Sequence, residues 1–313
     1  MPEWKILVTD GLAENGLAIL SNAAQVDEHK DISTEKLISI MSEYDALIVR
    51  GRTRVTAEVF TAAKKLKVVG RAGVGVDNID LAAANFHNVT VVNSPLATTQ
   101  AVAEHTLALI FALARSLPSA DATMKSGLWL KKQFLGVEIK DQVLGIIGMG
   151  HIGSLVANMA KSLRMTVLGY DPFISPADIQ TREAAPATLQ DLFARSDFIS
   201  IHVPLNPETR GLIDGQSFGY MKHGIRLICT ARGGVIDETA LLGALESGQV
   251  AGAALDVFTN EPPGLSALVS HPRVITTPHI AAQTEEAQAR AAVDIATEVL
   301  AALRGDPLRW KIV

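Results

Sequence analysis

Short apolar runs alternate with amphipathic stretches along most of the chain. The runs have the β-branched composition of buried strands, and the stretches between them repeat apolar residues with helical spacing. This alternation predicts two doubly wound α/β units with parallel sheets, and a cleft between the units that faces the carboxyl ends of the second unit's strands. The predicted strands are residues 4–8, 46–49, 67–70, 90–92, 143–147, 166–170, 198–203, 226–229, 252–257 and 274–276; the predicted helices are residues 12–20, 34–42, 57–66, 81–86, 99–116, 154–163, 238–247 and 284–303.

One predicted strand, residues 143–147, leads into the glycine-rich turn Gly148-Met149-Gly150-His151-Ile152-Gly153. Between a strand and a helix, G-x-G-x-x-G predicts a dinucleotide site. The first glycine permits the turn, the second lets the backbone approach a pyrophosphate, and the third lets the helix pack close to the strand. The next predicted strand ends in Asp171, 18 residues after Gly153, close to the ~20 expected for an acid that binds a ribose 2′-hydroxyl. Because a carboxylate repels a 2′-phosphate, NAD is favoured over NADP.

The composition excludes several other classes of protein. A net charge of −5 gives no basic surface for nucleic acid or an anionic membrane. The longest apolar run, residues 106–114, is far shorter than the ~20 residues of a membrane span. The amino-terminal residues do not read as a signal peptide, and the single cysteine cannot form an internal disulfide. We therefore expect a cytoplasmic protein without a nucleic-acid or membrane partner and without a metal site.

Three polar residues follow predicted strands in the second unit. Arg232 lies in Thr-Ala-Arg-Gly-Gly, Glu261 in Asn-Glu-Pro-Pro, and His279 in Thr-Pro-His-Ile. Alone, each residue type is usually solvated, but together at one edge of a nucleotide-binding sheet they fit hydride transfer with a 2-hydroxy acid. A histidine can accept the hydroxyl proton, a carboxylate beside it fixes the tautomer, and an arginine can pair with the substrate carboxylate.

The chain also resembles the D-isomer-specific 2-hydroxyacid dehydrogenase family, most closely its phosphoglycerate-oxidising members. The motifs that carry this resemblance appear in order over nearly the whole chain. They are Val49-Arg50-Gly51-Arg52-Thr53, Gly70-Arg71-Ala72-Gly73-Val74-Gly75-Val76-Asp77-Asn78, the glycine turn with Tyr170-Asp171-Pro172, His202-Val203-Pro204-Leu205, Ala231-Arg232-Gly233-Gly234, Asp256-Val257-Phe258 with Glu261-Pro262, and Pro278-His279-Ile280-Ala281.

The resemblance implies a Rossmann NAD domain at residues 99–283 and a flavodoxin-like substrate domain made of residues 1–98 and 284–313. The last helix would then fold back onto the amino-terminal residues. Two chains would form a homodimer through their NAD domains. His279 would be the acid/base, Glu261 its partner and Arg232 the carboxylate clamp. The implied cofactor-binding residues are Gly148, Gly150, His151, Ile152, Gly153, Asp171, Pro204, Thr209, Thr230, Asp256 and Ala281; the implied substrate-binding residues are Arg50, Gly51, Val74, Gly75, Thr98 and Arg232.

The sequence departs from the phosphoglycerate-oxidising members in the substrate domain. Gly51 stands where those members usually have Ser, and Ala97-Thr98 where they usually have Gly-Asn. Thr98 keeps a hydroxyl donor, and neighbouring arginines keep positive charge for an anionic tail. We expect 3-phosphoglycerate as substrate and thus a place in serine biosynthesis, with sulfolactate or hydroxypyruvate/glyoxylate as alternatives. A carboxyl-terminal regulatory domain is not expected, because the chain ends at Val313.

A different class also fits: an NAD-sensing, corepressor-like binding protein would share the fold and the Arg–Glu–His set. It would show little turnover. Formate dehydrogenases are disfavoured, because Glu261 stands where that branch carries Gln.

Overall fold

The computed structural model describes residues 4–313 and confirms two α/β units with parallel sheets. The first unit comprises Met1–Thr98 and Ala282–Val313, and the second comprises Thr99–Ala281. The chain returns to the first unit at Ala282, two residues before the boundary that the sequence predicts.

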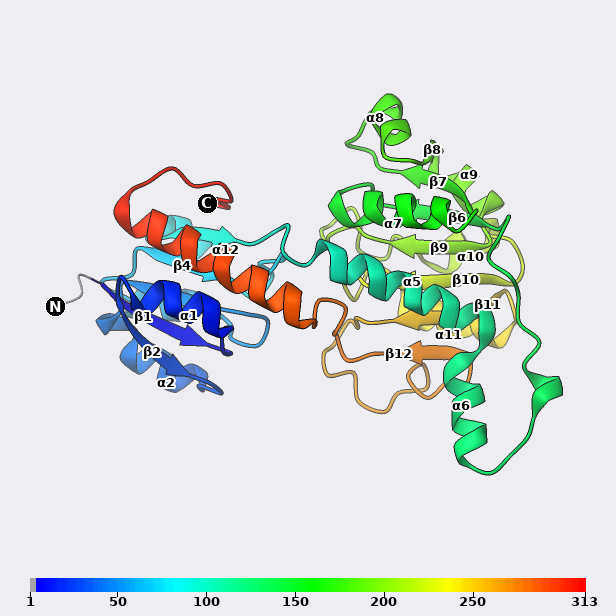
Figure 1. The fold of residues 1–313 in the computed structure, drawn as a ribbon, viewed down its shortest axis with the longest axis horizontal. Coiled ribbons are helices and arrows are strands. Elements are labelled where there is room, and N and C mark those ends of the chain that lie inside the picture. Colours follow the sequence, from blue (N-terminus) through cyan, green and yellow to red (C-terminus); the bar gives the residue numbers. More distant parts are fainter. Residues whose placement is uncertain (1–3) are drawn as a thin grey trace. The chain divides into compact units, whose positions relative to one another are not determined.

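The first unit has a five-stranded sheet of order β2-β1-β3-β4-β5, the flavodoxin-like order. Apolar side chains fill both faces, with α2, α3 and α4 on one side and α1 and α12 on the other (Figure 1). The elements are β1 (Lys5–Thr9), α1 (Glu14–Ser21), β2 (Gln25–His29), α2 (Thr34–Ile40), the 3₁₀ turn η1 (Met41–Glu43), β3 (Ala46–Val49), α3 (Ala57–Ala62), β4 (Val68–Arg71), α4 (Leu81–Phe86), β5 (Thr90–Asn93) and α12 (Glu285–Arg304).

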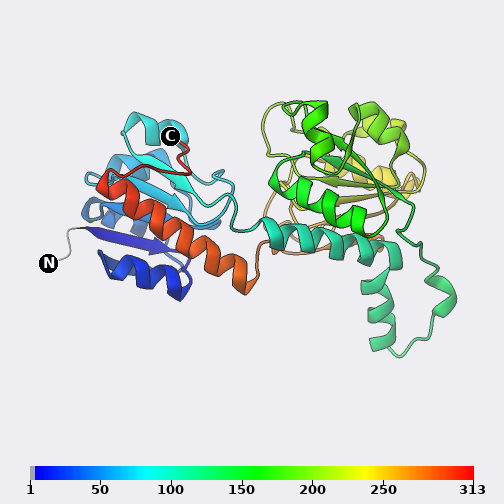
Figure 2. The same cartoon turned by 45° about the horizontal axis from the view of Figure 1, so that its top comes forward.

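The last helix, α12, belongs to the first unit. It lies beside α1 and crosses β4 and β5 (Figures 1 and 2). Glycines allow this close approach, because a Cβ atom at Gly16 would stand 2.7 Å from that of Ala292, and one at Gly70 would stand 2.5 Å from a methyl of Val299. Beyond α12, the final residues hydrogen-bond to residues 91 and 93 at the β5 edge.

The second unit has a seven-stranded sheet of order β12-β11-β10-β9-β6-β7-β8, in which β6 is flanked by β7 and β9, as in a Rossmann fold. Helices α5 and α7 cover one face, and α9, α10 and α11 cover the other. The elements are α5 (Thr99–Arg115), α6 (Leu117–Lys125), η2 (Lys131–Gln133), β6 (Val143–Ile147), α7 (His151–Ser162), β7 (Thr166–Tyr170), α8 (Pro176–Thr181), β8 (Ala185–Pro186), α9 (Leu189–Arg195), β9 (Phe198–Ile201), α10 (Gly215–Tyr220), β10 (Ile225–Cys229), α11 (Glu238–Glu246), β11 (Val250–Leu255) and β12 (Val274–Thr276).

Two differences from the predicted elements have clear causes. Strand β2 is not predicted, because Val26 is its single apolar residue among polar neighbours; it is an edge strand that pairs with β1 through its backbone. Helix α7 begins at His151 rather than at the predicted Ser154. Gly150 takes the extended conformation of a cap residue, so the second half of the glycine motif already forms the first helical turn.

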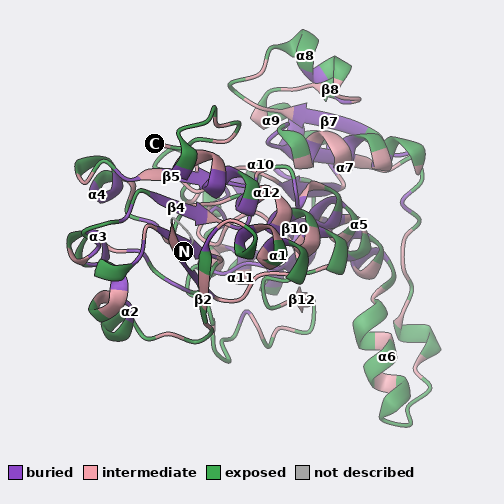
Figure 3. Ribbon diagram, turned by 60° about the vertical axis from the view of Figure 1, so that its left-hand side comes forward, coloured by how far each residue is buried: buried purple, intermediate pink, exposed green. Residues whose placement is uncertain are grey.

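Helix α6 and the segment that follows it extend away from the rest of the second unit (Figures 1 and 2). None of the residues of α6 is buried, and the burial colouring of Figure 3 shows this arm as exposed or half-buried. Among residues 4–313, no helix is both long and apolar enough to cross a bilayer.

Candidate functional site

His279 and Glu261 form a hydrogen-bonded pair in the second unit. Glu261 follows β11, His279 follows β12, and His279 Nδ1 lies 2.7 Å from Glu261 Oε2. Burial alone would raise the pKa of Glu261, but the hydrogen bonds from His279 and the Phe258 N–H, with the charges of His279 and Arg232, hold it below its usual value. An ionised Glu261 favours the proton on Nδ1, which leaves Nε2 to exchange a proton with a ligand.

Asp256 fixes the loop that carries His279. Its fully buried carboxylate accepts the N–H groups of residues 280 and 281 at 2.9 Å each and the Thr277 hydroxyl at 2.5 Å. His105 of α5 lies 3.3 Å from that hydroxyl. The backbone of His279 has φ 53°, a left-handed conformation that a free loop seldom keeps, and its N–H donates to the Asp256 carbonyl. Sequence reasoning gives Asp256 a cofactor role, but it identifies neither this brace nor His105.

Arg232 lies in the loop after β10, three residues beyond Cys229. Its Nη1 donates to the Ala231 carbonyl at 2.7 Å. Its charge helps to lower the pKa of Glu261. The structure therefore places all three predicted catalytic residues in loops at the carboxyl ends of adjacent strands, β10, β11 and β12.

The three motif glycines differ in their surroundings. Gly148 has φ 94°, and a Cβ there would stand 2.8 Å from the His202 carbonyl carbon. At Gly150 a Cβ would meet open space, which leaves room for a ligand, whereas at Gly153 it would stand 2.0 Å from the Gly148 carbonyl oxygen. This is the pattern that a turn, a phosphate contact and tight helix packing require.

Asp171 follows β7 and binds the glycine turn directly. Its Oδ2 accepts the Met149 N–H at 2.9 Å, and its Oδ1 accepts the Phe173 N–H at 3.0 Å. A carboxylate has about four acceptor positions, so two remain for the hydroxyls of a ribose. His151 and Ile152 begin the first turn of α7, which no side chain caps, so its N–H groups are available for an anion.

The remaining predicted cofactor residues lie at the same edge of the second sheet. Thr209 donates to the Pro204 carbonyl at 2.6 Å, which closes the turn after β9. Buried Thr230 shares a hydrogen bond of 3.1 Å with Thr106 of α5. Ala281 is buried against Asp256.

In the first unit, the turn that carries Arg50 and Gly51 is held from both sides. Asp10 accepts the N–H groups of Arg50 and Thr53 at 3.0 Å each and the Thr53 hydroxyl at 2.7 Å. Asn78 donates to the carbonyls of the same two residues at 2.9 and 2.6 Å. The Arg50 guanidinium donates to Gln283, just before α12. Sequence reasoning misses Asp10, which stands 40 residues before Arg50.

The other predicted substrate residues lie in two further loops of the same unit. Asn93 donates to the Val74 carbonyl at 2.7 Å and so fixes the loop with Gly75. Thr98 is 5% exposed, and Arg290 of α12 donates to the preceding carbonyl, that of Ala97, at 3.0 Å.

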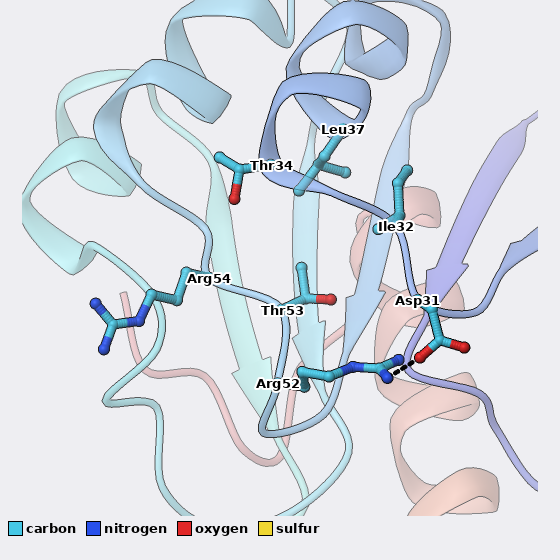
Figure 4. A pocket seen from close by; sticks show the side chains of 7 residues that line it. All are labelled: Asp31, Ile32, Thr34, Leu37, Arg52, Thr53 and Arg54. Carbon is cyan, nitrogen blue, oxygen red and sulfur yellow. Dashed lines mark hydrogen bonds and ion pairs between the residues drawn. The ribbon is translucent and has the colours of Figure 1, made fainter. Parts of the chain in front are cut away.

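A pocket of about 360 Å³ lies near the turn that carries Arg50 and Gly51, but neither of these two residues lines it. Figure 4 shows Arg52 paired with Asp31 across the pocket, while Arg54 points away from the other lining side chains. Because Arg52 is already paired and Arg54 is turned away from the other lining residues, we assign this pocket no part in substrate binding.

The charge of Asp10 allows its role in holding the Arg50–Thr53 turn to be tested by changing the pH. Burial would raise its pKa, but the hydrogen bonds from Thr53 and Arg50 and the charge of Arg52 hold it below its usual value. Ionised Asp10 therefore stabilises the fold above the ordinary carboxyl pKa, and this contribution is lost as the pH falls through the lowered value. Asp10→Asn is expected to destabilise the first unit by about 2 kcal/mol at pH 7, and the gap to the parent should close below about pH 4.

The measurement is urea unfolding followed by the fluorescence of Trp4 and Trp310, in a Trp129→Phe background so that only the first unit reports. Asp31→Asn, at an exposed carboxylate, is the matched control and should cost less than about 0.5 kcal/mol. A gap between Asp10→Asn and the parent that did not change with pH would contradict the proposed role of the Asp10 charge.

The Rossmann strand order, the glycine turn and the terminal acid define the second unit as an NAD-binding domain. Residues 107–281 match the family described as "D-isomer specific 2-hydroxyacid dehydrogenase, NAD binding domain". The chain belongs to this D-isomer specific 2-hydroxyacid dehydrogenase family. No group of three or more potential metal-ligating side chains occurs within residues 4–313.

Curated relatives carry the name D-3-phosphoglycerate dehydrogenase. One from Synechocystis sp. is 46% identical over 305 residues, which cover 97% of this chain and 55% of the relative. Another, named D-3-phosphoglycerate dehydrogenase 2, chloroplastic, from Arabidopsis thaliana, is 47% identical and covers 98% of this chain and 49% of the relative. The chain thus spans about half the length of the curated relatives it matches.

Solved structures share the whole fold. The TT0316 protein from Thermus thermophilus is 32% identical with a TM-score of 0.89, covering 99% of this chain and 100% of that one. D-lactate dehydrogenase from Aquifex aeolicus, solved with NAD and lactic acid, is 29% identical with a TM-score of 0.85 and covers 96% of each chain.

Proposed function

We propose that this protein is an NAD-dependent dehydrogenase of D-2-hydroxy acids with an anionic tail, and that it oxidises D-3-phosphoglycerate to 3-phosphohydroxypyruvate. The observation that carries the proposal is the 2.7 Å pair of His279 and Glu261 in the loops after β12 and β11 of an NAD-binding domain, with Arg232 in the loop after the adjacent strand β10. The names of the curated relatives support the choice of substrate.

Each residue of the proposed site would have a separate role in the reaction. Bound NAD would supply the hydride acceptor. His279 Nε2 would take the hydroxyl proton as the C2 hydride leaves, and Glu261 would stabilise the imidazolium that results. Arg232 would pair with the substrate carboxylate and polarise the oxygen at C2. Gly148, Gly150, His151, Ile152 and Gly153 would receive the pyrophosphate and Asp171 the ribose; the remaining proposed cofactor contacts are Pro204, Thr209, Thr230, Asp256 and Ala281.

We further propose that the anionic tail is bound by the first unit. Arg50 brings positive charge, and the held turns supply backbone N–H groups at Gly51, Val74 and Gly75. Thr98 would add a hydroxyl, although it is buried in this structure. Gly51 and Thr98, with Ala97, are the positions at which the chain departs from phosphoglycerate-oxidising members, so we expect them to affect the choice of substrate.

The test is NADH formation by the purified protein with D-3-phosphoglycerate, D-glycerate, D-lactate and both enantiomers of sulfolactate, followed by NADH oxidation with hydroxypyruvate and glyoxylate. We expect turnover with D-3-phosphoglycerate to exceed that with the others. Preference for another acid would overturn the substrate and keep the reaction class. No turnover with any acid, while NAD still binds, would overturn the reaction class in favour of an NAD-sensing binding protein.

We also propose that the protein is a homodimer, joined through the second unit. The arm that contains α6, residues 117–135, carries large exposed apolar side chains, among them Trp129 at 77% and Leu135 at 96% exposure. Soluble monomers seldom expose so much apolar surface in one place. A second copy of the chain is the partner that the family resemblance implies. Sedimentation equilibrium checks this, and a monomer at micromolar concentration would contradict it.

We propose a cytoplasmic location, because the single cysteine, Cys229, is buried and suits a reducing compartment. Cell fractionation with an antibody against the protein tests it; recovery outside the cytoplasmic fraction would contradict it.

A further inference from the structure

Glu238, the first residue of α11, contacts the loop that carries Glu261. Its Oε1 accepts the Thr259 N–H at 2.6 Å, across 21 residues of sequence. Thr259 lies two residues before Glu261, and the neighbouring Phe258 N–H binds Glu261 itself at 3.1 Å. Two adjacent backbone donors therefore face two carboxylates: one belongs to the proposed catalytic pair, and the other comes from a different element.

The segment before Glu238, residues 234–237, is held by burial and by backbone hydrogen bonds. Val235 and Ile236 are buried, and residues 234–237 exchange backbone hydrogen bonds with residues 211–213. Asp237 caps α11 by accepting two N–H groups, at 2.9 and 3.0 Å. Displacement of the Glu238 backbone would require this whole connection to open.

The same segment touches the loop a second time, at Gly233. A Cβ atom there would stand 1.9 Å from the carbonyl carbon of Phe258 and 2.5 Å from the nitrogen of Thr259. Two backbones thus lie in direct contact immediately after Arg232. The lining of a cavity of only about 10 Å³ includes Arg232, Glu238 and Val257, so little empty space remains here. The Glu238 carboxylate adds a directional hydrogen bond to this backbone contact.

We propose that Glu238 is a positioning residue: by holding the Thr259 N–H, it keeps the loop in the conformation in which Glu261 bonds His279. The inference rests on the proposed dehydrogenase function. Glu238 does not touch the reacting groups; it connects the element that carries Arg232 to the loop that carries Glu261. Charge-assisted hydrogen bonds to backbone N–H groups are among the stronger fixed contacts in proteins, and small misplacements of catalytic groups cost rate steeply.

The experiment compares Glu238→Ala, Glu238→Gln and the control Glu246→Ala, which removes an exposed carboxylate at the other end of the same helix. For Glu238→Ala we expect kcat to fall about tenfold, with KM for NAD within twofold of the parent. The pH at which NADH oxidation with the 2-oxo acid is half lost should also move downward, because a loosened Glu261 stabilises the imidazolium of His279 less. Glu238→Gln keeps an acceptor oxygen and should recover most of kcat, and Glu246→Ala should match the parent.

Thermal unfolding of each variant separates positioning from folding. Glu238 also lies in the first turn of α11, where an acid stabilises the helix. A loss of kcat in Glu238→Ala that follows a fall in Tm, without a displaced pH profile and without rescue by Gln, would overturn the inference. Parental kcat and pH profile in Glu238→Ala would overturn it as well. Failure of the parent to turn over any hydroxy acid would instead reject the proposed function on which the inference rests.

Discussion

Replacement of His279 by alanine is expected to lower kcat by about 10²- to 10⁴-fold, the usual contribution of a positioned general base. Nδ1 is occupied by Glu261, so Nε2 is the ring atom left for the substrate proton. Binding of NAD should change little, because the glycine turn and Asp171 do not contact the imidazole. The checks are steady-state turnover with the preferred hydroxy acid and NAD titration by fluorescence.

Two further variants complete this test. The left-handed backbone at residue 279 strains alanine, whereas asparagine tolerates that conformation, so His279→Asn should show the same loss without a folding defect. His223→Ala removes an exposed histidine and should match the parent. Substantial turnover in His279→Asn would show that another group takes the proton.

Replacement of Arg232 by alanine is the second large effect we expect. Removing one partner of a close charge pair costs about 3 kcal/mol, or ~10²-fold in kcat/KM for the hydroxy acid. Arg232→Lys should recover only part of this, because an ammonium lacks the planar pair of donors that fits a carboxylate. The charge of Arg232 also helps to lower the pKa of Glu261, so the Ala variant loses some of the stabilisation of that carboxylate.

The readout for Arg232 is the ratio of kcat/KM values for the acid and for the corresponding 2-hydroxy amide. Loss of the clamp should bring this ratio close to one, since the amide has no carboxylate charge to pair. Arg195→Ala, at the exposed end of α9, is the control and should keep the parental ratio. An unchanged preference for the acid in Arg232→Ala would mean that another cation binds the carboxylate.

Local sequence patterns were sufficient to predict part of the fold and of the candidate site. The glycine turn is readable because strand, turn, helix and terminal acid follow one another within about thirty residues, the span of one βαβ unit. Strands β3, β7 and β12 are buried or bounded by turns, and their predicted limits agree with the structure. The candidate set of Arg232, Glu261 and His279 is readable for a related reason, since each residue stands within a few residues of the end of an apolar run.

Other features left no such pattern. The polar edge strand β2 is held by backbone pairing with β1, which hydrophobic periodicity cannot report. Asp10, Asp256 and Glu238 each fix a loop that is 20 or more residues away in sequence, and a lone carboxylate after a strand or at a helix start reads as a turn or a cap. The return of α12 to the first unit was implied by family resemblance alone, because alternation does not show which sheet a terminal helix covers.

That return of α12 has a consequence for the order of folding during synthesis. Residues 99–281 are complete before α12 is made, by a margin of 23 residues to its end at Arg304. One face of the β1–β5 sheet, by contrast, waits from residue 98 to residue 304 for that helix to cover residues such as Ile6 and Ile48. At usual translation rates of 5–20 residues per second, the wait is about 10 to 40 s. We expect the second unit to fold first on the ribosome and the first unit only after residue 304 has emerged. Protease protection of chains arrested at successive lengths would show this order, and protection of the first unit in chains without α12 would contradict it. The uncovered sheet would be the part of the nascent chain most in need of a chaperone.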